Sequence, residues 1–169
     1  MVLSFGDKYV LKVYGEDHEL IDVVAQGRMI KFTSPGGKVQ NARVLSVSVD
    51  TLELDTSQKY HNNKTKIATD VYVNTMHGAA TYNVNKEPFI SDKDGVIFKN
   101  QVVKIRESDS LLSLMIGRIM DISFGGIHAQ NGLTECRLLL DVSVEGEKRF
   151  IDKNCTEVAN DYIATLVEE

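Results

Sequence analysis

The segment at residues 121–126 combines the residue types with the clearest chemical potential in this sequence. It reads Asp-Ile-Ser-Phe-Gly-Gly and follows a run of apolar residues. We expect a strand that ends in Asp121-x-Ser123 and a turn at Gly125-Gly126, because glycine accepts the positive φ values of tight turns. A carboxylate there can accept the paired N–H donors of a guanine edge, and a hydroxyl can reach a phosphate. The simpler alternative is that Asp121 and Ser123 only cap the turn.

Other chemistry is poorly represented in the sequence. The motifs GxSxG, HExxH, GxxxxGK[ST] and GxGxxG are absent, as is an EF-hand loop, and the four histidines are dispersed without ligand spacing. His77 is interpreted as a turn residue. Cys136 and Cys155 have no CxxC or histidine companion, so we expect two thiols in an apolar layer and neither a zinc site nor a disulfide framework. We therefore expect no enzyme, no metal site and no cofactor.

Composition and charge narrow the class of protein. The chain has 169 residues, of which 43% are hydrophobic and 25% are charged, as in globular proteins with one or two domains. Residues 1–99 carry 12 basic and 12 acidic side chains, whereas residues 100–169 carry 7 and 12. This acidic balance argues against nonspecific nucleic-acid binding but leaves room for a small anionic ligand or a protein partner. We expect a cytosolic protein without membrane insertion, because no apolar run resembles a signal or a membrane span.

Alternating apolar and polar residues predict strands through most of residues 1–99. Residues 27–34 and 39–54 alternate with the period of two of a half-buried strand and are separated by Pro35-Gly36-Gly37, a turn signal. Together they predict a small antiparallel meander. The polar stretch at residues 55–66 predicts a loop. Further strand patterns occur at residues 67–75, 80–84 and 95–99, with hairpin turns at His77-Gly78 and Asp94-Gly95.

Residues 100–169 predict a second group of strands that ends in a helix. The apolar segment at 111–123 contains Gly117, which favours a strand over a helix. Strands are also expected at 137–144 and 148–151, on either side of a hairpin turn. Asn154 or Thr156 can cap a helix, and apolar residues then recur at helical spacing through Glu168. The sequence thus predicts a mainly β protein, with two small antiparallel β-barrels in tandem, at residues 1–99 and 100–169, and a C-terminal α-helix.

The segment at residues 121–127 resembles the DxSxxG signature of PilZ domains, which are β-barrels that bind the bacterial second messenger cyclic di-GMP. The ending RFIDKNCTEVANDYIATLVEE is similar to the usual PilZ ending of an Arg-Phe strand and a terminal helix. Residues 27–99 resemble the small β-barrel that precedes PilZ in receptors of the flagellar-brake type. The resemblance implies a cytoplasmic protein of bacterial signalling, with a role in motility.

The site implied by the resemblance departs from the family pattern. In the family, an RxxxR motif leads into the PilZ barrel, and its two arginines hold the phosphates and stack on the guanines of the ligand. Here one alignment puts Asn100 and Lys104 at those positions and another puts Arg106 and Ser110 there, so each leaves one cation where the family has two. The implied ligand-binding residues are Lys104, Arg106, Asp121, Ser123 and Gly126.

Three functions remain open from the sequence. The chain is either a cyclic di-GMP receptor or a degenerate PilZ adaptor that acts through protein–protein contacts without a nucleotide. The missing arginines and the acidic second half favour the adaptor. The alternative is a structural or assembly β-protein, for example a phage or secretion component, with no nucleotide ligand.

Overall fold

The computed structural model confirms the mainly β, antiparallel class. It describes residues 3–34, 36–57, 63–106, 114–127 and 134–161. The chain divides into two compact units, Met1–Val96 and Ile97–Glu169. Within the described residues, no helix combines the length and the apolar character needed to cross a membrane.

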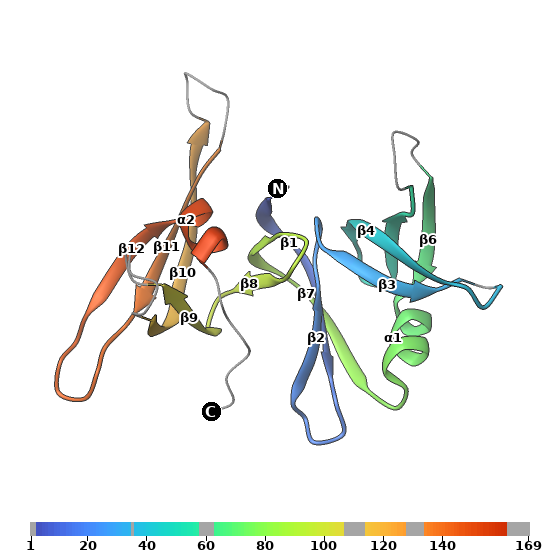
Figure 1. Cartoon of the computed structure of the whole chain (residues 1–169), viewed down its shortest axis with the longest axis horizontal. Coiled ribbons are helices and arrows are strands. Elements are labelled where there is room, and N and C mark those ends of the chain that lie inside the picture. Colours follow the sequence, from blue (N-terminus) through green and yellow to red (C-terminus); the bar gives the residue numbers. More distant parts are fainter. Residues whose placement is uncertain (1–2, 35, 58–62, 107–113, 128–133, 162–169) are drawn as a thin grey trace. The chain divides into compact units, whose positions relative to one another are not determined.

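Two four-stranded sheets build the first unit (Figure 1). In one sheet the strand order is β3-β4-β5-β6, so neighbours in the chain are neighbours in the sheet. This is the predicted antiparallel meander, extended by one strand. The other sheet has the order β2-β1-β7-β8. The strands are β1 (Ser4–Tyr14), β2 (Leu20–Val24), β3 (Met29–Thr33), β4 (Val39–Val47), β5 (Thr51–Asp55), β6 (Lys64–Ala68), β7 (Thr81–Ser91) and β8 (Val96–Phe98), the last of which crosses the division between the units.

Side chains from both sheets share one core in the first unit. Leu52 and Leu54 alternate with more exposed residues along β5 and are fully buried, as the period of two predicts. They pack with Leu11 and Val13 of β1 and with Phe32 of β3. Full burial of one such side chain stabilises the fold by about 1.5–3 kcal/mol. This shared core gives the unit its barrel-like character.

Residues 69–77 form a helix, which corrects the strand expected at 67–75. Strand β6 begins at Lys64, inside the predicted polar loop, and α1 (Thr69–His77) follows it directly. The β-branched residues of this segment favoured a strand in the sequence analysis. The side chains that face the core are nevertheless spaced as on one face of a helix: Thr69, Tyr72, Val73 and Met76.

Gly78 ends α1 and does not form a hairpin turn with His77. Its φ of 66° is one that glycine adopts without strain, and its N–H donates to the carbonyl of Asn74. His77 is therefore the last residue of a helix.

One four-stranded sheet and one helix make up the described part of the second unit. The strand order is β12-β11-β10-β9, and each neighbouring pair is antiparallel. A turn centred on Gly146, with a φ of 83°, lies between β11 and β12, as predicted. The elements are β9 (Val102–Arg106), β10 (Leu114–Ile127), β11 (Thr134–Asp141), β12 (Phe150–Asn154) and α2 (Cys155–Asp161).

The helix α2 confirms the predicted terminal helix over its described residues. The Asn154 side chain accepts a hydrogen bond of 2.8 Å from the N–H of Thr156, which caps the helix as expected. The predicted continuation through Glu168 lies outside the described residues. Cys155 and Cys136 form a disulfide with a Cα–Cα distance of 5.3 Å, so the prediction of two free thiols is wrong. Their separation of 19 residues concealed the pairing, because β12 folds back along β11 and returns the chain to Cys136.

A polar cluster centred on Asp22 joins α1 to the strands of the first unit. The Asp22 carboxylate accepts hydrogen bonds from Arg28 at 2.7 Å and from the Tyr72 hydroxyl at 2.8 Å, and it lies 2.9 Å from Nε2 of His77. Arg28 also donates to the carbonyl of Val23. His77, interpreted as a turn residue in the sequence, is thus a partner of a carboxylate 55 residues away in the chain.

Burial and hydrogen bonding act in opposite directions on Asp22. Burial alone would raise the pKa of this carboxyl, but the charge and hydrogen bond of Arg28, with the hydrogen bonds of His77 and Tyr72, hold its pKa below the ordinary value of 3.8. Burial and the nearby carboxylate raise the pKa of Tyr72, so its hydroxyl stays a donor. Both carboxylate oxygens of Asp22 are engaged within the cluster, whereas Nε of Arg28 is buried without a hydrogen-bond partner. Because the contacts join α1 to the strands, we assign the cluster a structural role.

Replacing Asp22 with Asn should destabilise the first unit by about 1–3 kcal/mol at neutral pH, because Arg28 loses its charged partner. Since folding lowers the pKa of Asp22, its stabilisation is complete above the ordinary carboxyl pKa and is lost as the pH falls through the folded value. The difference between wild type and Asp22→Asn should therefore shrink at about pH 3. Denaturant unfolding at both pH values measures this. An equal effect of Asp94→Asn, at an exposed turn residue, would contradict it.

Candidate binding face of the second sheet

The sheet of the second unit, β12-β11-β10-β9, is called the second sheet below. It has an inner face, which α2 covers, and an outer face on the opposite side. Along β9, Val103 and Ile105 are fully buried, whereas Val102 and Lys104 are partly exposed. Along β11, Leu138 and Leu140 lie on the same side as Cys136, which is bonded to α2. We define the outer face by the remaining side chains of the alternation: Val102, Lys104, Ile116, Arg118, Met120, Asp121, Ser123, Arg137, Leu139, Asp141, Phe150 and Asp152.

A β-bulge at Met120 determines which residues of β10 reach the outer face. Ile119 pairs with Leu140 and Asp121 pairs with Leu139, so Met120 is an extra residue in β10. Met120 and Asp121 are both exposed, between the buried Ile119 and Ile122. Without the extra residue, strict alternation from Ile119 would direct Asp121 inward. The bulge therefore brings the carboxylate to the outer face.

Asp121 and Ser123 lie within β10 and not at its end. Both are exposed, and Ser123 pairs across the strands with Arg137. The strand continues to Ile127, so the predicted turn at Gly125-Gly126 is wrong. These glycines instead coincide with a second irregularity of register, between Phe124 and Ile127. Glycine in a strand marks a bulge as readily as a turn, and the sequence alone did not distinguish the two.

Lys104 lies far from the Asp121 carboxylate. Lys104 pairs with Ile116, which precedes Asp121 by five positions in β10. At about 3.3 Å per residue, the two rows of the sheet are about 15 Å apart. Arg106, at the end of β9, pairs with Leu114, further still from Asp121, and its side chain lies outside the described residues. Among the predicted site residues, only Asp121, Ser123 and Gly126 share one stretch of strand.

The cation nearest to Ser123 in the register is Arg137, which the sequence analysis did not select. Its Nε donates to the carboxylate of Asp152 at 3.0 Å, and both side chains are largely exposed. An exposed ion pair of this kind contributes little to stability, about 0–1 kcal/mol. The alternation of side chains along the strand could have identified Arg137, because it places Arg137 on the other face of the strand from the inward-facing Leu138.

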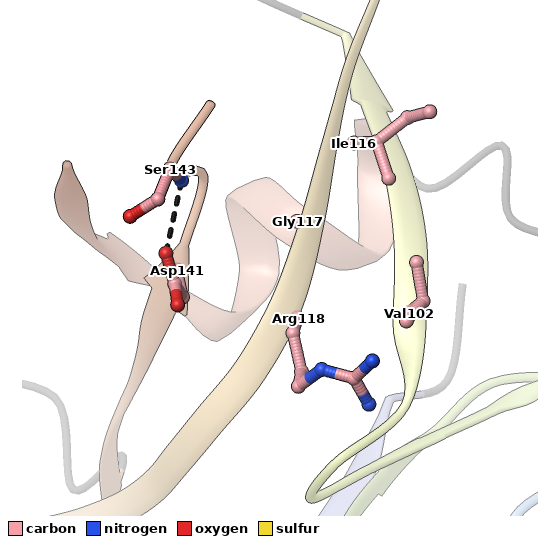
Figure 2. Close-up of a pocket in the computed structure, with 6 residues that line it drawn as sticks. All are labelled: Val102, Ile116, Gly117, Arg118, Asp141 and Ser143. Carbon is pink, nitrogen blue, oxygen red and sulfur yellow. Dashed lines mark hydrogen bonds between the residues drawn. The ribbon is translucent and has the colours of Figure 1, made fainter. Parts of the chain in front are cut away.

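A shallow hollow of about 240 Å³ lies at the other end of the outer face (Figure 2). Val102, Ile116 and Gly117 contribute apolar surface, and Arg118, Asp141 and Ser143 contribute polar groups. Figure 2 shows the Arg118 guanidinium directed away from Asp141, and it donates to the carbonyl of Asn100 at 2.9 Å. The hydroxyl and backbone N–H of Ser143 lower the pKa of Asp141. The polar groups of the hollow are therefore engaged with the protein itself.

Four large apolar side chains are exposed on the outer face. Ile116 is 58% exposed, Phe150 is 53% exposed, Leu139 is 39% exposed and Met120 is 36% exposed. They alternate with charged residues that face one another across strands, as Arg118 faces Asp141. The sequence of leucines at 138–140 could have predicted this exposure, because three consecutive residues of a strand cannot all face the core.

The described residues contain no cluster of side chains suited to holding a metal ion. No three His, Cys, Asp or Glu side chains gather in this part of the chain. Comparison of the chain with known protein families, with curated proteins and with solved structures finds no match. The PilZ resemblance of residues 121–127 therefore stays a prediction.

Replacing both Asp121 and Ser123 with Ala should change the free energy of unfolding of the second unit by less than about 0.5 kcal/mol, because both side chains are exposed within a continuous strand. Thermal or denaturant unfolding of the double variant measures this. A loss well above about 1 kcal/mol would show that the pair stabilises the strand instead.

Proposed function

We propose that this chain is a non-enzymatic, PilZ-like regulatory binding protein that acts as an adaptor through protein–protein contacts. The outer face of the second sheet is the surface we assign to those contacts. The observation that carries the proposal is the exposure of Ile116, Met120, Leu139 and Phe150 on one face of one sheet. Exposed apolar side chains gathered on one surface are typical of interaction sites.

The charges of the outer face favour a protein over a nucleic acid or a nucleotide. The face carries three cations, Lys104, Arg118 and Arg137, and three anions, Asp121, Asp141 and Asp152. Arg137 and Asp152 already form an ion pair. A polyanion needs an excess of positive charge, which this face lacks. A protein surface that offers apolar side chains and few unpaired charges complements it better.

Cyclic di-GMP reception is the second candidate, and one observation favours it. Asp121 and Ser123 are exposed on the same face, with the guanidinium of Arg137 opposite Ser123. A carboxylate, a hydroxyl and a guanidinium are groups suited to a guanine edge and a phosphate. Against this candidate, Lys104 is about 15 Å away along the sheet, so the second cation of the family pattern does not join the group.

The adaptor proposal predicts that Leu139→Lys removes partner binding. The full chain is immobilised, extract of the producing cells is passed over it, and retained proteins are quantified by mass spectrometry. For proteins that bind the outer face, the amount retained by Leu139→Lys should be at least about tenfold lower than the amount retained by the wild type. This factor corresponds to about 1.4 kcal/mol of lost binding free energy.

Val144→Lys is the matched control for this experiment. Val144 belongs to the same unit and is 68% exposed, but it lies in the turn after β11 and not on the outer face. It should retain the same proteins as the wild type. If Leu139→Lys and Val144→Lys retain identical sets in identical amounts, the outer face is not the contact surface.

Titration calorimetry with cyclic di-GMP separates the two candidates. The adaptor proposal predicts no heat of binding at ligand concentrations of about 100 μM, because paired cations are missing. Saturable heat that disappears in Asp121→Ala with Ser123→Ala would establish the receptor instead.

A further inference from the structure

The disulfide between Cys136 and Cys155 is the feature that neither proposed function uses. Cys136 lies in β11 and Cys155 is the first residue of α2. Both are buried, with exposures of 4% and 1%. The bond therefore attaches the beginning of the helix to β11, one residue before the pairing of β11 with β12 begins.

Few other described contacts hold α2 on the sheet. The described part of the helix, Cys155–Asp161, has seven residues. Val158 is fully buried, whereas Thr156 and Glu157 are exposed. Among the described side chains of the helix, Cys155 and Val158 are the buried ones, and Cys155 is also bonded to the sheet.

The surface under α2 is strongly apolar. The helix contacts β9, β11 and β12, and thus reaches from one edge strand of the sheet to the other. Five side chains of the inner face, on β9, β10 and β11, are completely buried. They are Val103, Ile105, Ile119, Leu138 and Leu140.

We propose that the Cys136–Cys155 disulfide is a redox-sensitive switch that controls the docking of α2. A dithiol reductant supplies two electrons and two protons, which break the Sγ–Sγ bond and leave two cysteine thiols, while the reductant closes its own disulfide. The helix then loses its covalent anchor and undocks, and the inner face becomes accessible. An oxidised dithiol reverses the reaction.

Because both sulfurs are buried, reduction of the disulfide is linked to displacement of α2. A thiolate must approach one sulfur in line to exchange, and both cysteines are buried where the beginning of α2 meets β11. Reduction therefore requires transient displacement of α2. Disulfides in the cytosol, the compartment expected from the sequence, are uncommon and usually catalytic or redox-sensing, which agrees with a reversible bond.

Hydrogen exchange of the full chain, followed by mass spectrometry, tests the switch. One sample is equilibrated with oxidised dithiothreitol and the other with reduced dithiothreitol, and thiol titration should find zero and two thiols respectively. We expect amides of α2 to exchange at least about tenfold faster in the reduced sample. Amides of β10 and β11 should retain most of their protection, because their pairing does not involve the bond.

Cys136→Ala with Cys155→Ala is the control. In this variant α2 should exchange rapidly with or without reductant, which separates loss of the bond from other effects of the reagent. If the variant does not fold, the comparison of oxidised and reduced wild-type protein still tests the proposal. Three results would overturn the proposal: two free thiols after oxidation, equal exchange of α2 in both samples, or loss of protection throughout β10 and β11 together with α2.

Discussion

The alternation of side chains along β10 and β11 is the constraint on which the second unit depends. Successive residues of a strand face opposite sides, so a sheet with one covered face must expose every second residue on the other. Here α2 and its disulfide cover one side, where Leu138 and Leu140 are fully buried. Leu139 must then face outward, and the exposed apolar side chains follow from the same geometry that builds the core.

The extra residue Met120 in β10 changes which side chains lie on the outer face. The bulge at Met120 keeps Ile119 and Ile122 buried and leaves Asp121 outside with Ser123. The same strand separates this pair from Lys104, because β9 pairs with the opposite half of β10. The outer face thus presents apolar groups among balanced charges, with no concentration of cations, and that distribution favours a protein partner.

Local patterns in the sequence predicted the fold class, the meander, the Gly146 turn and the Asn154 cap, because each is set by neighbouring residues. Four features depended on contacts between distant residues and were missed or misassigned. In α1, β-branched residues indicated a strand, but packing against the core selected a helix. The Asp22–His77 contact and the Cys136–Cys155 bond join residues that only the folded sheets bring together. At Gly125-Gly126, the turn and the irregular strand share one sequence signal.

The central claim is that one face of the second sheet is closed and that the other exposes apolar side chains among balanced charges. Hydroxyl-radical footprinting of the full chain, with the disulfide intact, tests this claim most directly. Met120, Leu139 and Phe150 should be modified readily, whereas Leu138 and Leu140, with the same chemistry as Leu139, should be protected. Equal modification of the three consecutive leucines, or protection of Leu139 together with Phe150, would contradict the account.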